Sequence, residues 1–130
     1  MTAPADVGVE LAALQDIQDS LASIAHRTDP ERRFELVQLR KRLAKQIAVV
    51  GSACERLFAT QADRQAEFRR LYSAMRSATA LHQAEWPAVR LNEVDHLYRE
   101  SASRAREANQ IFASWLAAQL GPEPMREHAG

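Results

Sequence analysis

The fold of this chain depends on the stretch ATQADRQAE, residues 59–67, where nine consecutive residues carry no large apolar side chain. On both sides of it apolar residues recur at helical spacing. The stretch is therefore either a loop that joins two helices or the polar part of one long helix. Between Pro30 and Pro87 the chain contains no other proline, and Gly51 is its only glycine.

Helical phase favours the long helix. At about 100° per residue, the apolar residues before and after the stretch fall on one stripe. Leu57 and Phe68 are eleven residues apart, close to three whole turns, and a loop would normally reset this phase. We therefore expect a central helix over about residues 30–86, roughly 80 Å long at ~1.5 Å per residue. The apolar stripe comprises Leu36, Leu43, Ile47, Val50, Cys54, Leu57, Phe58, Phe68, Tyr72, Met75 and Trp86.

The alternative is a break near Thr60. Thr60 and Asp63 have the spacing of a weak capping box, which would start a new helix there. This reading gives an ordinary four-helix up-down bundle in place of three helices.

A shorter helix is expected on each side of the central one. Leu14, Ile17, Leu21 and Ile24 recur at spacings of three and four and predict an amphipathic helix of about 20 residues that ends near His26. The central helix, which follows it, would be capped at its N-terminus by Asp29 with Pro30 at its first position, or by a capping box of Thr28 and Glu31.

The last helix is the most regular. Its apolar face has small residues in the middle, where another helix can approach closely, and Leu120 followed by Gly121 and Pro122 predicts its end. We expect residues 121–130 to form a disordered tail. The face comprises Leu91, Val94, Tyr98, Ser101, Ala105, Ala108, Phe112 and Trp115.

Composition supports a helical domain. Only nine of the 130 residues are Gly or Pro, which argues against the many turns of a β-sandwich or barrel and against Gly-rich phosphate loops. The formal net charge is zero, so no global attraction to nucleic acid or membrane is implied. Asp6 and Glu10 near the N-terminus do not fit a signal peptide, and we expect a cytoplasmic protein. Fifteen Arg against two Lys, with 24 Ala, suggest a GC-rich bacterial genome.

These elements predict an all-α domain over residues 1–120. The first helix would fold back on the N-terminal half of the long helix (about residues 30–86), and the last on its C-terminal half. Such a core is only two helices thick and leaves part of the apolar stripe open, which predicts self-association or a dedicated partner. A homodimer with a four-helix cross-section is the favoured arrangement.

The turn around Trp86 holds the densest group of aromatic and imidazole side chains. Because Trp and Tyr are enriched at binding hot spots, Tyr72, His82, Trp86, His96 and Tyr98 are the candidate partner-binding residues, with core packing as the alternative role.

The same turn carries a candidate metal site. Glu93 and His96 have the Glu-x-x-His spacing of di-iron bundles, and His82 and Glu85 precede the turn. A di-iron site requires two such motifs, and only one is present, so no cofactor is expected.

Basic residues cluster at Arg40, Lys41, Arg42 and Lys45. Residues 1–26 carry four acids and no Lys or Arg, so the first helix is expected to lie against this basic segment. A stripe that contacts the phosphates of nucleic acid is the alternative, although no recognition motif accompanies it.

No catalytic constellation is recognisable. Cys54 falls within the apolar stripe and is interpreted as a small core residue. The chain is predicted to be a non-catalytic helical interaction protein, an adaptor, small chaperone or scaffold that binds a partner helix on an open apolar stripe. Nucleic-acid binding and metal binding are the alternatives.

Overall fold

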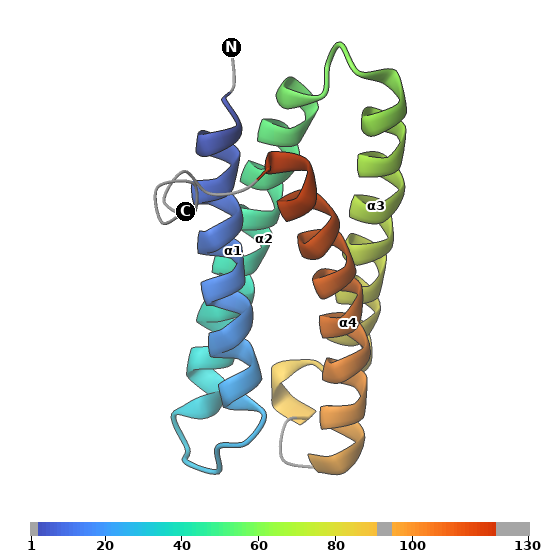
Figure 1. Cartoon of the computed structure of the whole chain (residues 1–130). Helices are drawn as coiled ribbons and strands as arrows, with labels where there is room; N and C mark the ends of the chain where they lie inside the picture. Colours follow the sequence, from blue (N-terminus) through green and yellow to red (C-terminus); the bar gives the residue numbers. More distant parts are fainter. Residues whose placement is uncertain (1–2, 91–94, 122–130) are drawn as a thin grey trace, which may run out of the picture.

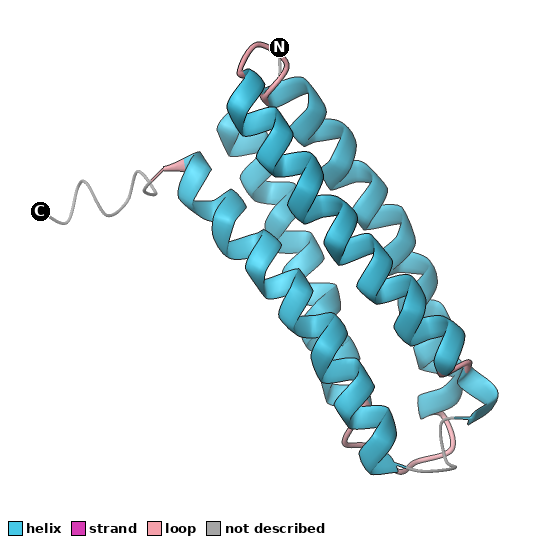
Figure 2. Cartoon of the chain, turned by 90° about the vertical axis from the view of Figure 1, so that its right-hand side faces the viewer, coloured by secondary structure: helices cyan, strands magenta, loops and turns pink. Residues whose placement is uncertain are grey.

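The computed structural model describes residues 3–90 and 95–121. These residues form an all-α, up-down bundle without strands, in which each helix runs antiparallel to the one before it (Figure 1). The helices lie along one common long axis (Figure 2). They are α1 (Pro4–Ile24), α2 (Arg32–Leu57), α3 (Ala62–Glu85) and α4 (Asp95–Leu120), with a short 3-10 turn η1 (Ala88–Arg90) before α4.

The expected single helix over residues 30–86 is wrong. Helix α2 ends at Leu57 and α3 begins at Ala62, so the chain reverses at residues 58–61, and the alternative break near Thr60 is confirmed. The Gln61 backbone N–H donates to the Phe58 carbonyl at 3.0 Å, and its side chain donates to the Leu57 carbonyl at 3.3 Å. These bonds satisfy acceptors that the end of a helix leaves open.

Helical phase failed as a criterion because two antiparallel helices turn their apolar faces to one core. Phe58 and Phe68, on either side of the reversal, are each 1% exposed, and their ring centroids are 6.1 Å apart. The short loop therefore preserved the phase without continuing the helix. The expected capping box also does not form, because Gln61 is the N-cap of α3 and no side chain caps it.

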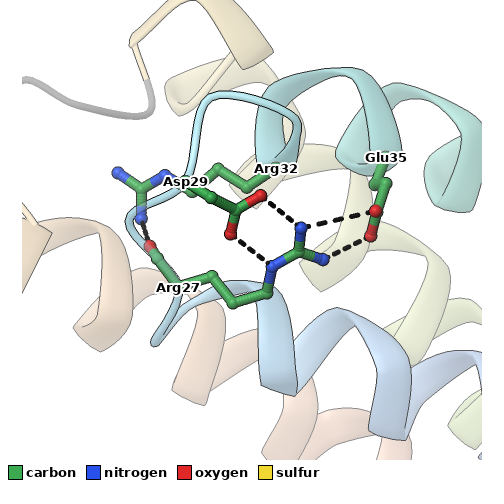
Figure 3. Close-up of polar contacts among 4 residues, drawn as sticks. All are labelled: Arg27, Asp29, Arg32 and Glu35. Carbon is green, nitrogen blue, oxygen red and sulfur yellow. Dashed lines mark hydrogen bonds and ion pairs between the residues drawn. The ribbon is translucent and has the colours of Figure 1, made fainter.

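The turn between α1 and α2 is held by hydrogen bonds of the Arg27 side chain and not by the predicted caps. Helix α1 ends at Ile24, close to the predicted position, but α2 begins only at Arg32, without a side-chain cap. The Arg27 guanidinium donates to both carboxylate oxygens of Asp29, at 2.7 and 2.5 Å, and also to Glu35 in the first turn of α2 (Figure 3). This guanidinium lowers the pKa of the Asp29 carboxyl. Asp29 is thus engaged by Arg27 instead of capping α2.

The end of the bundle at the α2–α3 turn is filled with aromatic side chains. Phe58, Phe68 and Phe112 are among its fully buried residues, and neighbouring ring centroids there lie 5.2–6.2 Å apart. The cluster, which we call the aromatic end, comprises Phe58, Phe68, Tyr72, Phe112 and Trp115.

Two other expectations about single residues are met. Cys54 is completely buried, as predicted for a core residue, and burial raises the pKa of its thiol to about 12. Helix α4 ends at Leu120, and Gly121 follows with a φ of +82°, the left-handed conformation common after helix C-termini. The expected tail beyond it, residues 122–130, lies outside the described residues.

The helices do not pack evenly. Helix α1 packs extensively on α2, as the acidic first helix was expected to do, and α3 packs extensively on α4, whereas α2 and α3 touch at few places. Four helices from one chain share the core, so the two-helix core on which the expected homodimer rested does not occur. In the described residues, none of the helices is long and apolar enough to span a bilayer.

Candidate functional site

The weak contact between α2 and α3 leaves an open groove of about 860 Å³ along the bundle. Its floor is apolar, with Leu43 and Ile47 from α2 and Phe68 and Tyr72 from α3. Its sides are formed largely by small residues, namely Ala44, Ala48, Gly51 and Ser52 on α2 and Ser73, Ser77 and Ala80 on α3. We call this surface the α2/α3 groove.

Tyr72 bridges the groove floor at a position that requires Gly51. The Tyr72 hydroxyl donates to the Ile47 carbonyl of α2 at 2.8 Å. A Cβ atom on Gly51 would lie 2.3 Å from that hydroxyl oxygen, far inside van der Waals contact. The absence of a side chain at Gly51 is therefore what lets the tyrosine reach the α2 backbone.

The charges along the groove are mainly positive. Glu55 is the one carboxylate among its lining residues in the described chain, and Arg69 already pairs with it at 2.7 Å. This pairing lowers the pKa of Glu55. Arg76 lies 5.6 Å from the centre of the Tyr72 ring, and no ion pair is found for it among the described residues. An acidic ligand would therefore complement the groove.

The structure brings together only some of the candidate partner-binding residues. His82 and Trp86 both lie against Tyr98, with ring centroids 5.4 and 5.8 Å from the tyrosine ring. Trp86 and Tyr98 are buried, so core packing is their structural role here. Tyr72 belongs to the aromatic end instead, and His96 is exposed.

The candidate metal ligands do not form a described cluster. The Nδ1 atom of His82 lies 2.7 Å from the Ser101 hydroxyl, and Glu85 and His96 are exposed. Glu93 lies outside the described residues. Among those described, no group of three or more His, Cys, Asp or Glu side chains is placed to hold a metal ion.

The basic cluster is divided between the surface and the interior. Lys41, Arg42 and Lys45 are exposed, whereas Arg40 lines a cavity inside the bundle. Arg40 is half-buried and its Nη2 atom is buried, so it offers less of its side chain to a surface ligand than the other three residues of the proposed stripe.

Sequence reasoning missed the groove because it followed only the apolar stripe. A second face of α2 carries Val37, Lys41, Ala44, Ala48 and Ser52 at spacings of three and four, and this recurrence of small residues was the available signal. No protein-family model, curated protein or solved structure matches the chain.

Proposed function

We propose that this protein is a helical protein–protein interaction module that binds an acidic amphipathic helix of a partner protein in the α2/α3 groove. The observation that carries the proposal is the open groove itself, along which the neighbouring helices α2 and α3 touch at few places. An apolar groove between helices is a common receptor for the apolar face of another helix.

Small side chains suit the groove to a helical ligand. Packed helices lie about 8–10 Å apart, and small residues at the contact allow the closest approach. Ala44, Ala48 and Ser52 occupy successive turns of α2 on the groove side. The groove extends over Leu43 to Glu55 on α2, roughly 18 Å at ~1.5 Å per residue, which matches about three turns of a ligand helix.

Exposed apolar residues extend this face beyond the groove. Val37 and Phe34 precede Lys41 and Ala44 on the same face of α2, and they are 36% and 67% exposed. Large exposed apolar side chains next to an apolar groove are typical of an interaction surface. They would contact the end of a ligand helix longer than the groove.

Charge defines the expected partner. Arg76 lines the groove, whereas the only groove carboxylate described is paired with Arg69. The exposed Lys41 and Lys45 precede the groove residue Ala48 on α2 by about two turns and about one turn. Complementary charge steers association and suppresses wrong partners more than it adds affinity. We therefore expect acidic residues on the flanks of the partner helix.

The test compares two alanines that are both exposed on helices. Ala48→Glu places a carboxylate in the groove, where it blocks and repels an acidic helix. Ala74→Glu makes the same change on α3 outside the residues that line the groove, and is the matched control. Affinity capture should recover the same partner with wild-type protein and with Ala74→Glu, and lose it with Ala48→Glu. A synthetic peptide of the partner segment should become helical on binding, measured by circular dichroism.

Several results would overturn this assignment. Equal capture by all three proteins would place the partner elsewhere. If sedimentation shows a dimer of the wild-type protein and of Ala74→Glu, and a monomer of Ala48→Glu, then a second copy of this chain occupies the groove. Salt-dependent retention on DNA or RNA that is lost after Lys41→Gln and Lys45→Gln would favour the nucleic-acid alternative.

A further inference from the structure

A second, partly open space lies between the helices, and its lining includes both buried and solvent-exposed side chains. It is a cavity of about 400 Å³ to which all four helices contribute side chains, and it shares Leu43, Thr79 and Gln83 with the α2/α3 groove. Its volume lies within the usual range of sites for small molecules, about 300–1,000 Å³. Much of the lining is apolar and includes Leu21, Ala25, Leu36 and Ala105.

Arg40 brings a positive charge into this cavity without a matching negative charge. It lies between Leu36 and Leu43 on the buried face of α2, and its Nη2 atom is buried with no hydrogen-bond partner. Burial lowers the pKa of its guanidinium, although an arginine still keeps its proton. A buried charge is costly unless it is paired and hydrogen-bonded, so an anion beside Arg40 would be stabilised.

A second orphaned polar atom lies in the same cavity wall. The Thr79 hydroxyl oxygen on α3 is buried and has no hydrogen-bond partner. The lining also contains Arg99 and Arg106, but it contains no Asp or Glu among the described residues. Native proteins satisfy nearly all buried polar groups, and a bound ligand with acceptor oxygens would satisfy both of these atoms.

His82 does not provide the missing charge. Its Nδ1 atom is engaged with the Ser101 hydroxyl at 2.7 Å. Burial and the nearby positive charges of Arg40 and Arg104 lower the pKa of His82 to about 4, so the imidazole is neutral at pH 7. Among the described residues, no acidic side chain lines this cavity beside the Arg40 guanidinium, so none of them provides the anion.

We propose that this cavity binds a small monocarboxylate with an apolar body, such as a medium-chain fatty acid or an aryl carboxylate. The carboxylate pairs with the Arg40 guanidinium and accepts a hydrogen bond from the Thr79 hydroxyl, and the apolar body lies against the leucine and alanine side chains. Guanidinium and carboxylate match in geometry and charge. The inference stands on the orphaned atoms of the cavity and does not depend on the function proposed for the groove.

A single negative charge fits this site better than a double one. One carboxylate balances the guanidinium of Arg40, because Arg99 and Arg106 are exposed to solvent and Arg106 already pairs with Asp19. A phosphate dianion would bring a second negative charge for which the described lining holds no further buried cation. A neutral alcohol of the same length would fill the apolar space and leave Arg40 unpaired.

Isothermal titration calorimetry with octanoate tests the proposal. Octanoate should bind wild-type protein one to one. Arg40→Met keeps the shape of the side chain and removes its charge, and it should weaken octanoate about ten- to hundredfold, as loss of a charge-assisted hydrogen bond does. Arg42→Met removes an exposed arginine from the same helix and should leave the affinity unchanged.

Two further measurements keep the result unambiguous. Octan-1-ol should bind wild-type protein and Arg40→Met with similar affinity. Thr79→Val removes only the orphaned hydroxyl and should weaken octanoate severalfold, so that it tests the site even if Arg40→Met fails to fold. No saturable binding of octanoate, equal affinity in wild type and in the folded cavity variants, or tighter binding of octyl phosphate than of octanoate would overturn the proposal.

Discussion

The two ends of the bundle are built on one helical framework but are filled differently. At the aromatic end, near the α2–α3 turn, the core positions of α3 and α4 hold Phe68 and Phe112, and the rings contact one another. Nearer the opposite end, the equivalent positions hold Thr79 and His82 on α3 and Ala105 on α4, and a cavity of about 400 Å³ remains. The helical arrangement alone therefore does not decide whether the core is filled with side chains or contains a cavity.

This difference between the two ends shows which core positions stabilise the fold and which are available for binding. Large aromatic side chains bury much area and dominate core energetics. Small or polar residues at core positions give up that stabilisation and leave space with polar groups in it. Substitutions at the aromatic end, in the groove and in the cavity should therefore have different effects.

The largest effect is expected at the aromatic end. Phe112 is fully buried and its ring lies 5.8 Å from Tyr72 and 6.2 Å from Phe68. Phe112→Ala should lower the free energy of unfolding by about 3–5 kcal/mol, because it removes buried area and leaves a cavity. Denaturant unfolding measures the change.

The neighbouring Ile111 provides the control for that substitution, because its side chain is 53% exposed. Ile111→Ala should change the free energy of unfolding by no more than about 0.5 kcal/mol. Similar losses at the two positions would show that the aromatic end is not the stabilising part of the core.

An intermediate effect is expected at the groove floor. Gly51→Ala would place a Cβ against the Tyr72 hydroxyl and displace the tyrosine, and this overpacking should cost about 1–3 kcal/mol. Gly8 is also inside a helix, but its Cβ would meet only Leu120 at an ordinary 3.9 Å.

Gly8→Ala should therefore stabilise the protein by up to about 1 kcal/mol, the difference in helix propensity between the two residues. Thermal unfolding of the two variants should shift in opposite directions. A stabilised Gly51→Ala protein would contradict the contact between Tyr72 and α2.

The last prediction concerns pH and the cavity. His82 has a pKa of about 4 in the folded protein, against 6.5 for the free side chain, so the unfolded chain binds the proton more readily. Its contribution to stability is therefore complete above about pH 6.5 and is lost as the pH falls toward 4. His82→Gln should flatten the decline in the free energy of unfolding between pH 7 and pH 5.

Carboxylates such as Asp29, whose pKa is also lowered, affect the wild type and His82→Gln alike and so cancel in this comparison. An equal slope in the two proteins would show that His82 is not held neutral by burial.

Much of the fold was predictable because helix ends have local chemical signals. Periodicity indicated the end of α1, and Leu120 with Gly121 marked the end of α4. The reversal at residues 58–61 was missed because Leu57 and Phe68 face the same core from two antiparallel helices, which preserves the phase that a single helix would show. The polar composition of residues 59–67 indicated the break between the two helices better than helical phase did.

The site was less predictable because it depends on how the helices pair. Arg40 continues the spacing of Leu36, Leu43 and Ile47, and Thr79 and His82 continue that of Met75 and Trp86. Polar residues at apolar positions were thus visible in the sequence. Only the packed bundle shows that they line one cavity, together with Ala102 and Ala105 of α4.

The most direct test of the proposed groove is photo-crosslinking in cells. A small diazirine-bearing side chain in place of Ala48 probes the α2/α3 groove, and the same side chain in place of Ala74 probes the exposed side of α3. We predict a crosslink to another protein from position 48, through a helical segment with acidic flanks, and none to that protein from position 74. Equal crosslinking from both positions, or crosslinks from position 48 only to a second copy of this chain, would contradict the account.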